Sequence, residues 1–281
     1  GWQTGISNPV AGAGFDAYGD WYRRSRSESA LKFPGVDTIT NAAHNVYLDL
    51  FAFGGWPLFL SYMGLSLLVV FAIVRVTRRK KDFDVVFVAM VAVWTCYQLQ
   101  SVISINQIGL AIWGWVSAAA LLGYEYHDRQ REILATIPSN PVRKLKSIKP
   151  SSGIVTPGLK AGLLSVLGML LAVPPLSADM KWNSAQLSQD VNRLIATLDP
   201  SYMNPLSSFK INSVVGVLEI NKFPEQAHEQ ALKAVVFYPD SFEAWRNITL
   251  LSKSTEREKL MARENMKRLD PLNQTIYMET E

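Results

Sequence analysis

The chain has 281 residues, a formal net charge of +4 at pH 7, a pI near 9.1 and a mean hydropathy of +0.08. Its 48% hydrophobic content and eight tryptophans favour a protein of mixed membrane and soluble segments over one or two soluble domains. The basic residues cluster beside apolar runs and not along an aromatic groove, so no nucleic-acid partner is expected.

Residues 1–45 read as a polar loop that precedes the first apolar run. The chain opens GWQTGISNPVAGAG, without a methionine or a charged segment leading into an apolar stretch, so we interpret it as the C-terminal part of a larger protein. Within this loop, the stretch WYRRSR contributes Arg23, Arg24 and Arg26.

Residues 46–124 are expected to form a membrane domain with about three spans. No charge occurs between Asp49 and Arg75, a window long enough to cross roughly 30 Å of hydrocarbon as a helix. Gly54, Gly55 and Pro57 predict an irregular start to this span. The next charge-free window, between Asp84 and Glu125, has a polar centre and predicts helices over 87–101 and 109–124. A hairpin that does not cross completely is the alternative for this pair.

Residues 125–157 are rich in Pro, Ser and Lys towards their end and predict a cytoplasmic linker. A fourth span is expected over 158–178, ending at Pro174 and Pro175. The single cysteine, Cys96, excludes an intrachain disulfide, and no Cys or His spacing indicates a metal, so no metal and no cofactor are expected.

Clusters of basic residues follow the first and third spans and predict that both loops are cytoplasmic; they are Arg75, Arg78, Arg79, Lys80, Lys81, and Arg129, Arg131, Arg143, Lys144, Lys146, Lys149. The loop between the second and third spans carries no Lys or Arg and is expected outside. By the same alternation, residues 1–45 and 179–281 are expected on the extracytoplasmic side.

Residues 179–281 have ordinary soluble composition and helical periodicity, which completes an all-α fold class: polytopic membrane helices followed by a soluble helical domain. One helix is expected from Ser184 to Leu198, and a second over PEQAHEQALKAVVFYP with Phe237 buried. The stretches IATLDP, AVVFYP and MKRLDP each end a helix at a proline, at intervals near the period of tetratricopeptide helical pairs. An irregular helical domain is the alternative.

His44 lies at the outer edge of the first span, in the sequence AHN. An imidazole titrates near neutral pH and can take a proton from an attacking sugar hydroxyl without a metal. Arg23, Arg24 and Arg26 lie on the same expected side, and arginine suits a pyrophosphate group because its planar fork makes paired hydrogen bonds. The alternatives are a helix cap or headgroup contact for His44 and a solvated patch for the arginines.

A resemblance to a known family rests on the order of these motifs. NPVAGAGFDAYGDWY, then AHNVYLDLFAFGGWPLFLSYMGL, a basic loop, a polar-centred hairpin and SINQIGLAIWGWVSAAALLG resemble the C-terminal part of the O-antigen ligase and polymerase family. The resemblance covers about residues 5–124. His44 and Asn45 match the family's His-Asn pair before a span, and Gly54-Gly55 matches its glycine step.

The resemblance implies a membrane glycosyltransferase in the bacterial cytoplasmic (inner) membrane. Its partners would be membrane lipid, an undecaprenyl-pyrophosphate-linked glycan as donor, and a glycan, lipid or protein acceptor outside that membrane. His44 would be catalytic, with Asn45 and the three arginines binding substrate. The alternative is a non-catalytic, membrane-anchored helical-repeat protein that recruits partners.

Overall fold

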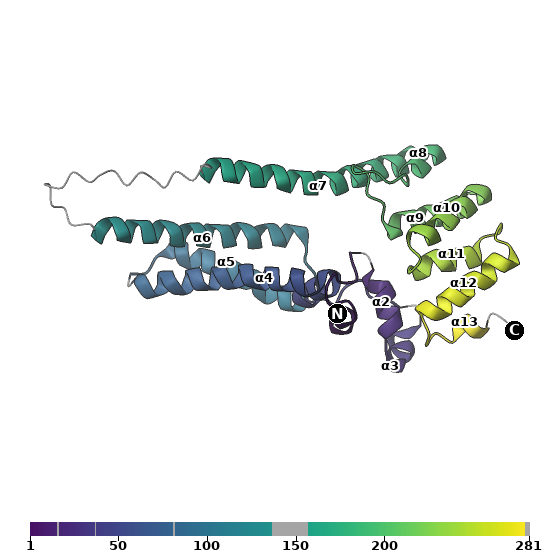
Figure 1. Cartoon of the computed structure of the whole chain (residues 1–281), viewed down its shortest axis with the longest axis horizontal. Coiled ribbons are helices and arrows are strands. Elements are labelled where there is room, and N and C mark those ends of the chain that lie inside the picture. Colours follow the sequence, from purple (N-terminus) through teal and green to yellow (C-terminus); the bar gives the residue numbers. More distant parts are fainter. Residues whose placement is uncertain (16, 37, 81, 137–156, 279–281) are drawn as a thin grey trace. The chain divides into compact units, whose positions relative to one another are not determined.

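This computed structural model describes residues 1–15, 17–36, 38–80, 82–136 and 157–278. The described residues form helices joined by turns, and apart from one isolated bridge between Ser201 and Asn204 they contain no β-structure. The predicted all-α fold class is therefore confirmed. The chain divides into two compact units, Gly1–Pro141 and Val142–Glu281, which are described separately (Figure 1).

Four helices are long and apolar enough to cross a membrane: α4 (Val46–Arg79), α5 (Val85–Ile103), α6 (Ile108–Thr136) and α7 (Pro157–Ser188). The shortest of them, α5, has 19 residues, which corresponds to about 28 Å of helix and still matches the hydrocarbon thickness of a bilayer. The chain is thus a helical multi-pass membrane protein with a soluble helical C-terminal part.

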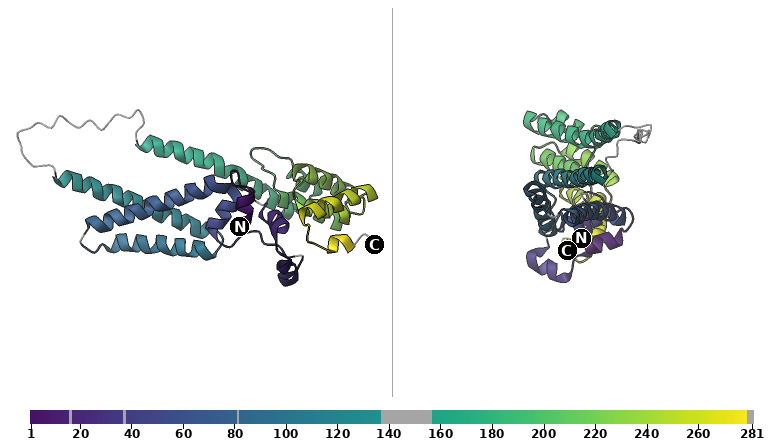
Figure 2. Two further views of the ribbon diagram at one scale, coloured as in Figure 1. Left: turned by 60° about the horizontal axis from the view of Figure 1, so that its bottom comes forward. Right: turned by 90° about the vertical axis from the view of Figure 1, so that its left-hand side faces the viewer.

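In the first unit, α4, α5 and α6 lie side by side (Figure 2). Their shared core contains Val69, Val76, Phe87, Trp94 and Leu121. Four short elements precede α4: α1 (Trp2–Ser7), α2 (Tyr18–Ser25), α3 (Glu28–Ala30) and a π-type turn, η1 (Leu31–Gly35).

Helix α6 continues 12 residues beyond Tyr124, so the expected end of this helix at residue 124 is wrong, whereas the cytoplasmic linker stays a prediction. The extension is stabilised by ion pairs with the end of α4. Arg79 contacts Glu125 at 2.5 Å and Asp128 at 3.8 Å, and Lys80 lies 3.9 Å from Asp128. The remainder of the expected linker, 137–156, and Lys81 lie outside the described residues.

In the second unit, α7 does not end at Pro174 and Pro175 as expected but continues to Ser188. A proline at position 174 removes the N–H that would bond the carbonyl of Leu170. The hydroxyl of Tyr202 donates to that carbonyl at 2.5 Å and replaces the missing bond. A residue 32 positions away therefore helps the helix to continue past its prolines.

The single helix expected from Ser184 to Leu198 is also wrong. The chain turns at Gln189, which has φ of 55°, and α8 (Val191–Ala196) begins again after it. The turn is fixed by Asp190, whose carboxylate accepts the N–H groups of Asn192 and Arg193 as an N-cap.

The rest of the second unit consists of helical pairs: α9 (Ser208–Ile220) with α10 (Pro224–Phe237), and α11 (Phe242–Leu250) with α12 (Glu256–Leu269), followed by α13 (Thr275–Met278). The first helices of the two pairs begin 34 residues apart, at Ser208 and Phe242. Buried alanines on α10, Ala227, Ala231 and Ala234, permit close packing. Phe237, expected to be buried, is 51% exposed.

Candidate functional site

Helix α4 is broken near its start, at Gly55, whose φ of 61° and ψ of −160° are accessible to glycine but not to other residues. A break in a membrane helix leaves backbone groups without partners. The turn at residues 8–14 supplies those partners. Ala13 N–H donates to Ala52 O at 2.7 Å, Gly14 N–H donates to Phe53 O at 3.1 Å, and Trp56 N–H donates to Pro9 O at 2.8 Å.

This arrangement explains two motifs that were separate in the sequence. The NPVAGAG turn and the Gly54-Gly55 step form one structure, in which the turn completes the hydrogen bonding of the broken helix. A Cβ atom at Gly55 would overlap the carbonyl of Pro9, and one at Gly12 would overlap the backbone of Phe53. The irregular start predicted from Gly54, Gly55 and Pro57 is therefore confirmed, and it takes the form of a break whose partner segment is residues 8–14.

Asn45 is the N-cap of α4. Its Oδ1 accepts the N–H of Leu48 at 3.0 Å, and its Nδ2 donates at 2.8 Å to the carbonyl of Val102 in the last turn of α5. The side chain thus ties the start of one membrane helix to the end of another. Contact between Asn45 and substrate, which the resemblance implies, stays a prediction.

His44 is exposed and has a φ of 54°, in the left-handed region that non-glycine residues seldom adopt. Its neighbours are both fixed: Ala43 N–H donates to Asp49 Oδ1 at 2.6 Å, and Asn45 caps α4. The cap is formed by Asn45, so His44 is not the cap residue. The segment is held rigidly while the imidazole remains accessible to a ligand.

The three arginines lie at and just beyond the end of α2. Arg23 and Arg26 are each only 5% exposed, so the alternative of a solvated patch is wrong for these two. Arg26 Nη1 donates to the carbonyl of Val36 at 2.8 Å, and the guanidinium of Arg24 lies over the ring of Trp21, 4.6 Å from its centroid. Their role in substrate binding stays a prediction.

Helix α2 packs against the segment that leads to His44. A Cβ atom at Gly19 would lie 3.1 Å from Oδ1 of Asn41, and the ring of Tyr18 lies 6.0 Å from that of Phe53. The pKa of Tyr18 is raised by burial, by the Asp49 carboxylate and by Tyr22, so its hydroxyl keeps its proton at neutral pH. The structure therefore brings the arginine-bearing helix next to the His44 segment.

An aromatic cavity of about 340 Å³ opens beside Asn45. Its walls include Trp2, Phe51, Trp56 and Phe59, and the Phe51 and Trp56 ring centroids are 4.6 Å apart. Such a lining provides no charged partner and suits a hydrocarbon chain. This cavity was not predicted, because Trp2 and Trp56 are far apart in sequence and read equally well as interfacial aromatics.

A polar cluster inside the helices was also missed. Oε1 of Gln98 accepts the hydroxyls of Tyr47 at 2.8 Å and Tyr62 at 3.2 Å, and its Nε2 donates to Ser66 Oγ at 3.3 Å. The need for partners around Gln98 was visible in the sequence, but the identity of the tyrosines depends on helix packing.

The opposite end of α4 carries the ion pairs of Arg79 and Lys80. Arg79 lies 23 residues beyond Trp56, which corresponds to about 35 Å of helix. There, the hydroxyl of Tyr124, the N–H of Phe87 and the ammonium of Lys80 lower the pKa of Asp84. The AHN segment and the basic cluster thus lie at opposite ends of one membrane-length helix. Among the described residues, no group of His, Cys, Asp or Glu has the arrangement of a metal site.

No family model, curated protein or solved structure matches this chain, so the resemblance to the ligase and polymerase family rests on the motifs named above.

Proposed function

We propose that this chain is part of a membrane glycosyltransferase of the O-antigen ligase and polymerase type, which moves a glycan from undecaprenyl pyrophosphate to an acceptor outside the bacterial cytoplasmic membrane. The observation that carries the proposal is the accessible His44, held between two fixed residues at the end of a broken membrane helix. A rigid backbone with an exposed imidazole is what positioning of a general base requires.

In the proposed reaction, a hydroxyl of the acceptor attacks the anomeric carbon of the donor glycan, and its proton passes to His44. The new glycosidic bond forms as the bond to the pyrophosphate oxygen breaks, and undecaprenyl pyrophosphate leaves. Arg23, Arg24 or Arg26 pairs with the pyrophosphate and stabilises its developing charge. Asn45 orients the AHN segment, and the aromatic cavity beside it suits the hydrocarbon of the donor.

One feature supports an extracytoplasmic site. The basic cluster at the end of α4 favours the cytoplasmic side for that end of the helix, which leaves the His44 end outside. Single cysteines in a Cys96→Ser background test this orientation. Cysteines at Ser29 and Ser188 should react with an impermeant maleimide in intact cells, and one at Ser151 should not. Labelling of Ser29 and Ser188 on opposite sides would contradict the proposal.

Glycan transfer by the full-length protein tests the chemistry. His44→Ala should lower the rate by about 10²- to 10⁴-fold, the range that loss of a general base produces. His127→Ala, the same change at an exposed histidine on α6, is the matched control and should transfer at the normal rate. Normal transfer by His44→Ala would remove His44 from the mechanism.

The alternative function is a membrane-anchored interaction protein. The paired helices α9–α10 and α11–α12 favour it, because stacked helical pairs commonly present a binding surface. Under this alternative, His44→Ala leaves the cellular function intact while disruption of the helical pairs abolishes it. The glycosyltransferase proposal expects the His44 variant to fail.

A further inference from the structure

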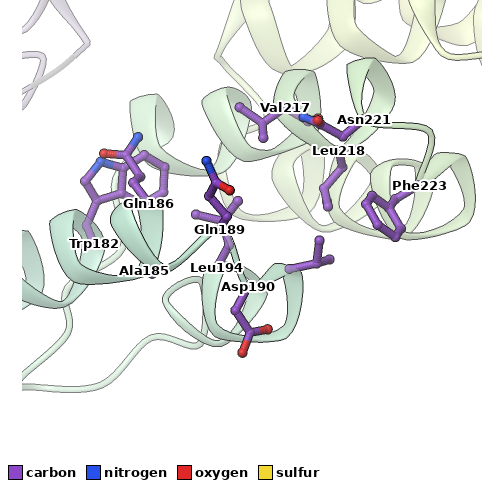
Figure 3. A pocket seen from close by; sticks show the side chains of 11 residues that line it. Trp182, Ala185, Gln186, Gln189, Asp190, Leu194, Val217, Leu218, Asn221 and Phe223 are labelled. Atoms are coloured by element: carbon purple, nitrogen blue, oxygen red, sulfur yellow. The ribbon is translucent and has the colours of Figure 1, made fainter.

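A cavity of about 520 Å³ lies in the second unit, between the end of α7, α8 and the end of α9. Figure 3 shows Trp182 and Gln186 on one side of it and Asn221 and Phe223 on the other, with Gln189 between them. The volume lies within the range of about 300 to 1,000 Å³ that ligand pockets have. The cavity belongs to the second unit alone and shares no residue with the His44 segment.

The apolar part of the lining is partly aromatic. Trp182 is anchored in the core of the unit and is 8% exposed, whereas Phe223 is 37% exposed and offers a ring to a ligand. Aromatic rings have negatively polarised faces, which attract the positively polarised C–H groups of a sugar ring.

The polar part of the lining consists of three amides and one carboxylate. Within the part of the chain that the structure describes, the side-chain amides of Gln186 and Gln189 make no hydrogen bond. Asn221 donates one N–H to the carbonyl of Val217 at 2.8 Å, which leaves its Oδ1 and second N–H for a ligand. Oδ1 of Asp190 accepts the N–H of Asn192 in the α8 cap, and Oδ2 lies 3.7 Å from Arg193 Nε.

This lining discriminates between ligand classes. An apolar ligand would desolvate three amides without giving them partners, which is unfavourable. An anionic ligand would face Asp190, and none of the described residues that line the cavity is a Lys or Arg. A sugar hydroxyl is both a donor and an acceptor, and so is each amide, so neutral sugars match the polar and the aromatic groups together.

From this match we propose that the cavity binds a neutral oligosaccharide. Its place along α7 fits such a ligand. The apolar window of α7 ends at Ala178, because Asp179 is the next charged residue. Gln186 lies eight residues beyond Ala178, which corresponds to about 12 Å along the helix. A glycan attached to the membrane surface can reach that height. The proposal goes beyond the glycosyltransferase function and does not depend on His44.

Saturation-transfer NMR on the full-length protein in phospholipid nanodiscs, free of glycoside detergents, tests this binding. The probes are neutral trisaccharides of hexose, N-acetylhexosamine and deoxyhexose, with trigalacturonate and a neutral tripeptide as comparison ligands. Gln186→Ala and Asn221→Ala should each weaken binding about five-fold, the effect of one net hydrogen bond of about 1 kcal/mol. Asn183→Ala, an exposed amide on α7 outside the cavity, is the matched control and should bind within two-fold of the parent.

Binding of a neutral trisaccharide that both cavity variants weaken and Asn183→Ala does not would support the proposal. Equal binding by all variants, binding by none of the neutral probes, or preference for the tripeptide or trigalacturonate would overturn it. His44→Ala is measured alongside. Loss of transfer with retained sugar binding separates this cavity from the catalytic proposal, so either can fail without the other.

Discussion

Replacing Gly55 by alanine tests whether the break in α4 depends on a glycine conformation and on contact with the turn at residues 8–14. The φ and ψ of Gly55 are almost inaccessible to alanine, at a cost of about 1 to 3 kcal/mol. The added Cβ also overlaps the carbonyl of Pro9, which is backbone and cannot rotate away. Displacing that carbonyl breaks the 2.8 Å bond from Trp56 N–H, worth about 1 to 3 kcal/mol when the group is left unpaired.

The expected loss of stability is therefore about 2 to 6 kcal/mol, a fall of at least about 4 °C in the thermal unfolding midpoint of the purified protein. Gly64→Ala is the matched control, because Gly64 lies in the same helix with open space around its Cα. In a helical conformation alanine is favoured over glycine by about 0.5 to 1 kcal/mol, so this variant should be as stable as the parent or more so. Equal midpoints for the two variants would refute the reasoning.

Three further outcomes are expected. Gln98→Leu should lower stability by about 1 to 2 kcal/mol, because two tyrosine hydroxyls lose their acceptor, whereas Gln100→Leu on the same helix should not; thermal unfolding of both variants decides this. Tyr202→Phe should loosen α7 at its prolines, seen as faster amide exchange near Leu170, and unchanged exchange would contradict that bond. The pKa of Glu258 is lowered, chiefly by the Thr255 N–H, so its contribution to stability is present above about pH 4.5 and is lost as the pH falls through the lowered value. Glu258→Gln should weaken the loss of unfolding free energy at acidic pH, measured by circular dichroism as a function of pH. An unchanged pH dependence would contradict this.

Local patterns predicted the features of the fold that depend on local chemistry. Charge-free windows marked the membrane helices, and Gly54, Gly55 and Pro57 marked the break in α4. The errors arose where a distant residue decides the local structure. The hydroxyl of Tyr202 donates to the carbonyl of Leu170, which helps α7 to continue past its prolines. Glu125 and Asp128 form ion pairs with Arg79 that stabilise the extension of α6 against α4.

The candidate site also combined features that the local sequence predicted with features that depend on distant residues. The AHN motif indicated a histidine at the outer edge of the first span, with a helix cap as the alternative, and the structure has Asn45 as the cap and His44 exposed. The burial of Arg23 and Arg26 was not visible in WYRRSR, because a run of charges is usually solvated. The cavity beside Trp182 joins residues from three helices, and no local pattern links them.

The ion pairs at the end of α4 have a consequence for the order of synthesis. Glu125, the partner of Arg79, is translated 46 residues after it, so Arg79 lacks this partner while α4 is being inserted. Acidic residues have little influence on topology at that stage. Once α6 has docked, the same guanidinium is neutralised by carboxylates and offers little attraction to anionic headgroups. Under the predicted orientation, a charge that directs the insertion of α4 thus becomes, in the finished protein, a bond between helices.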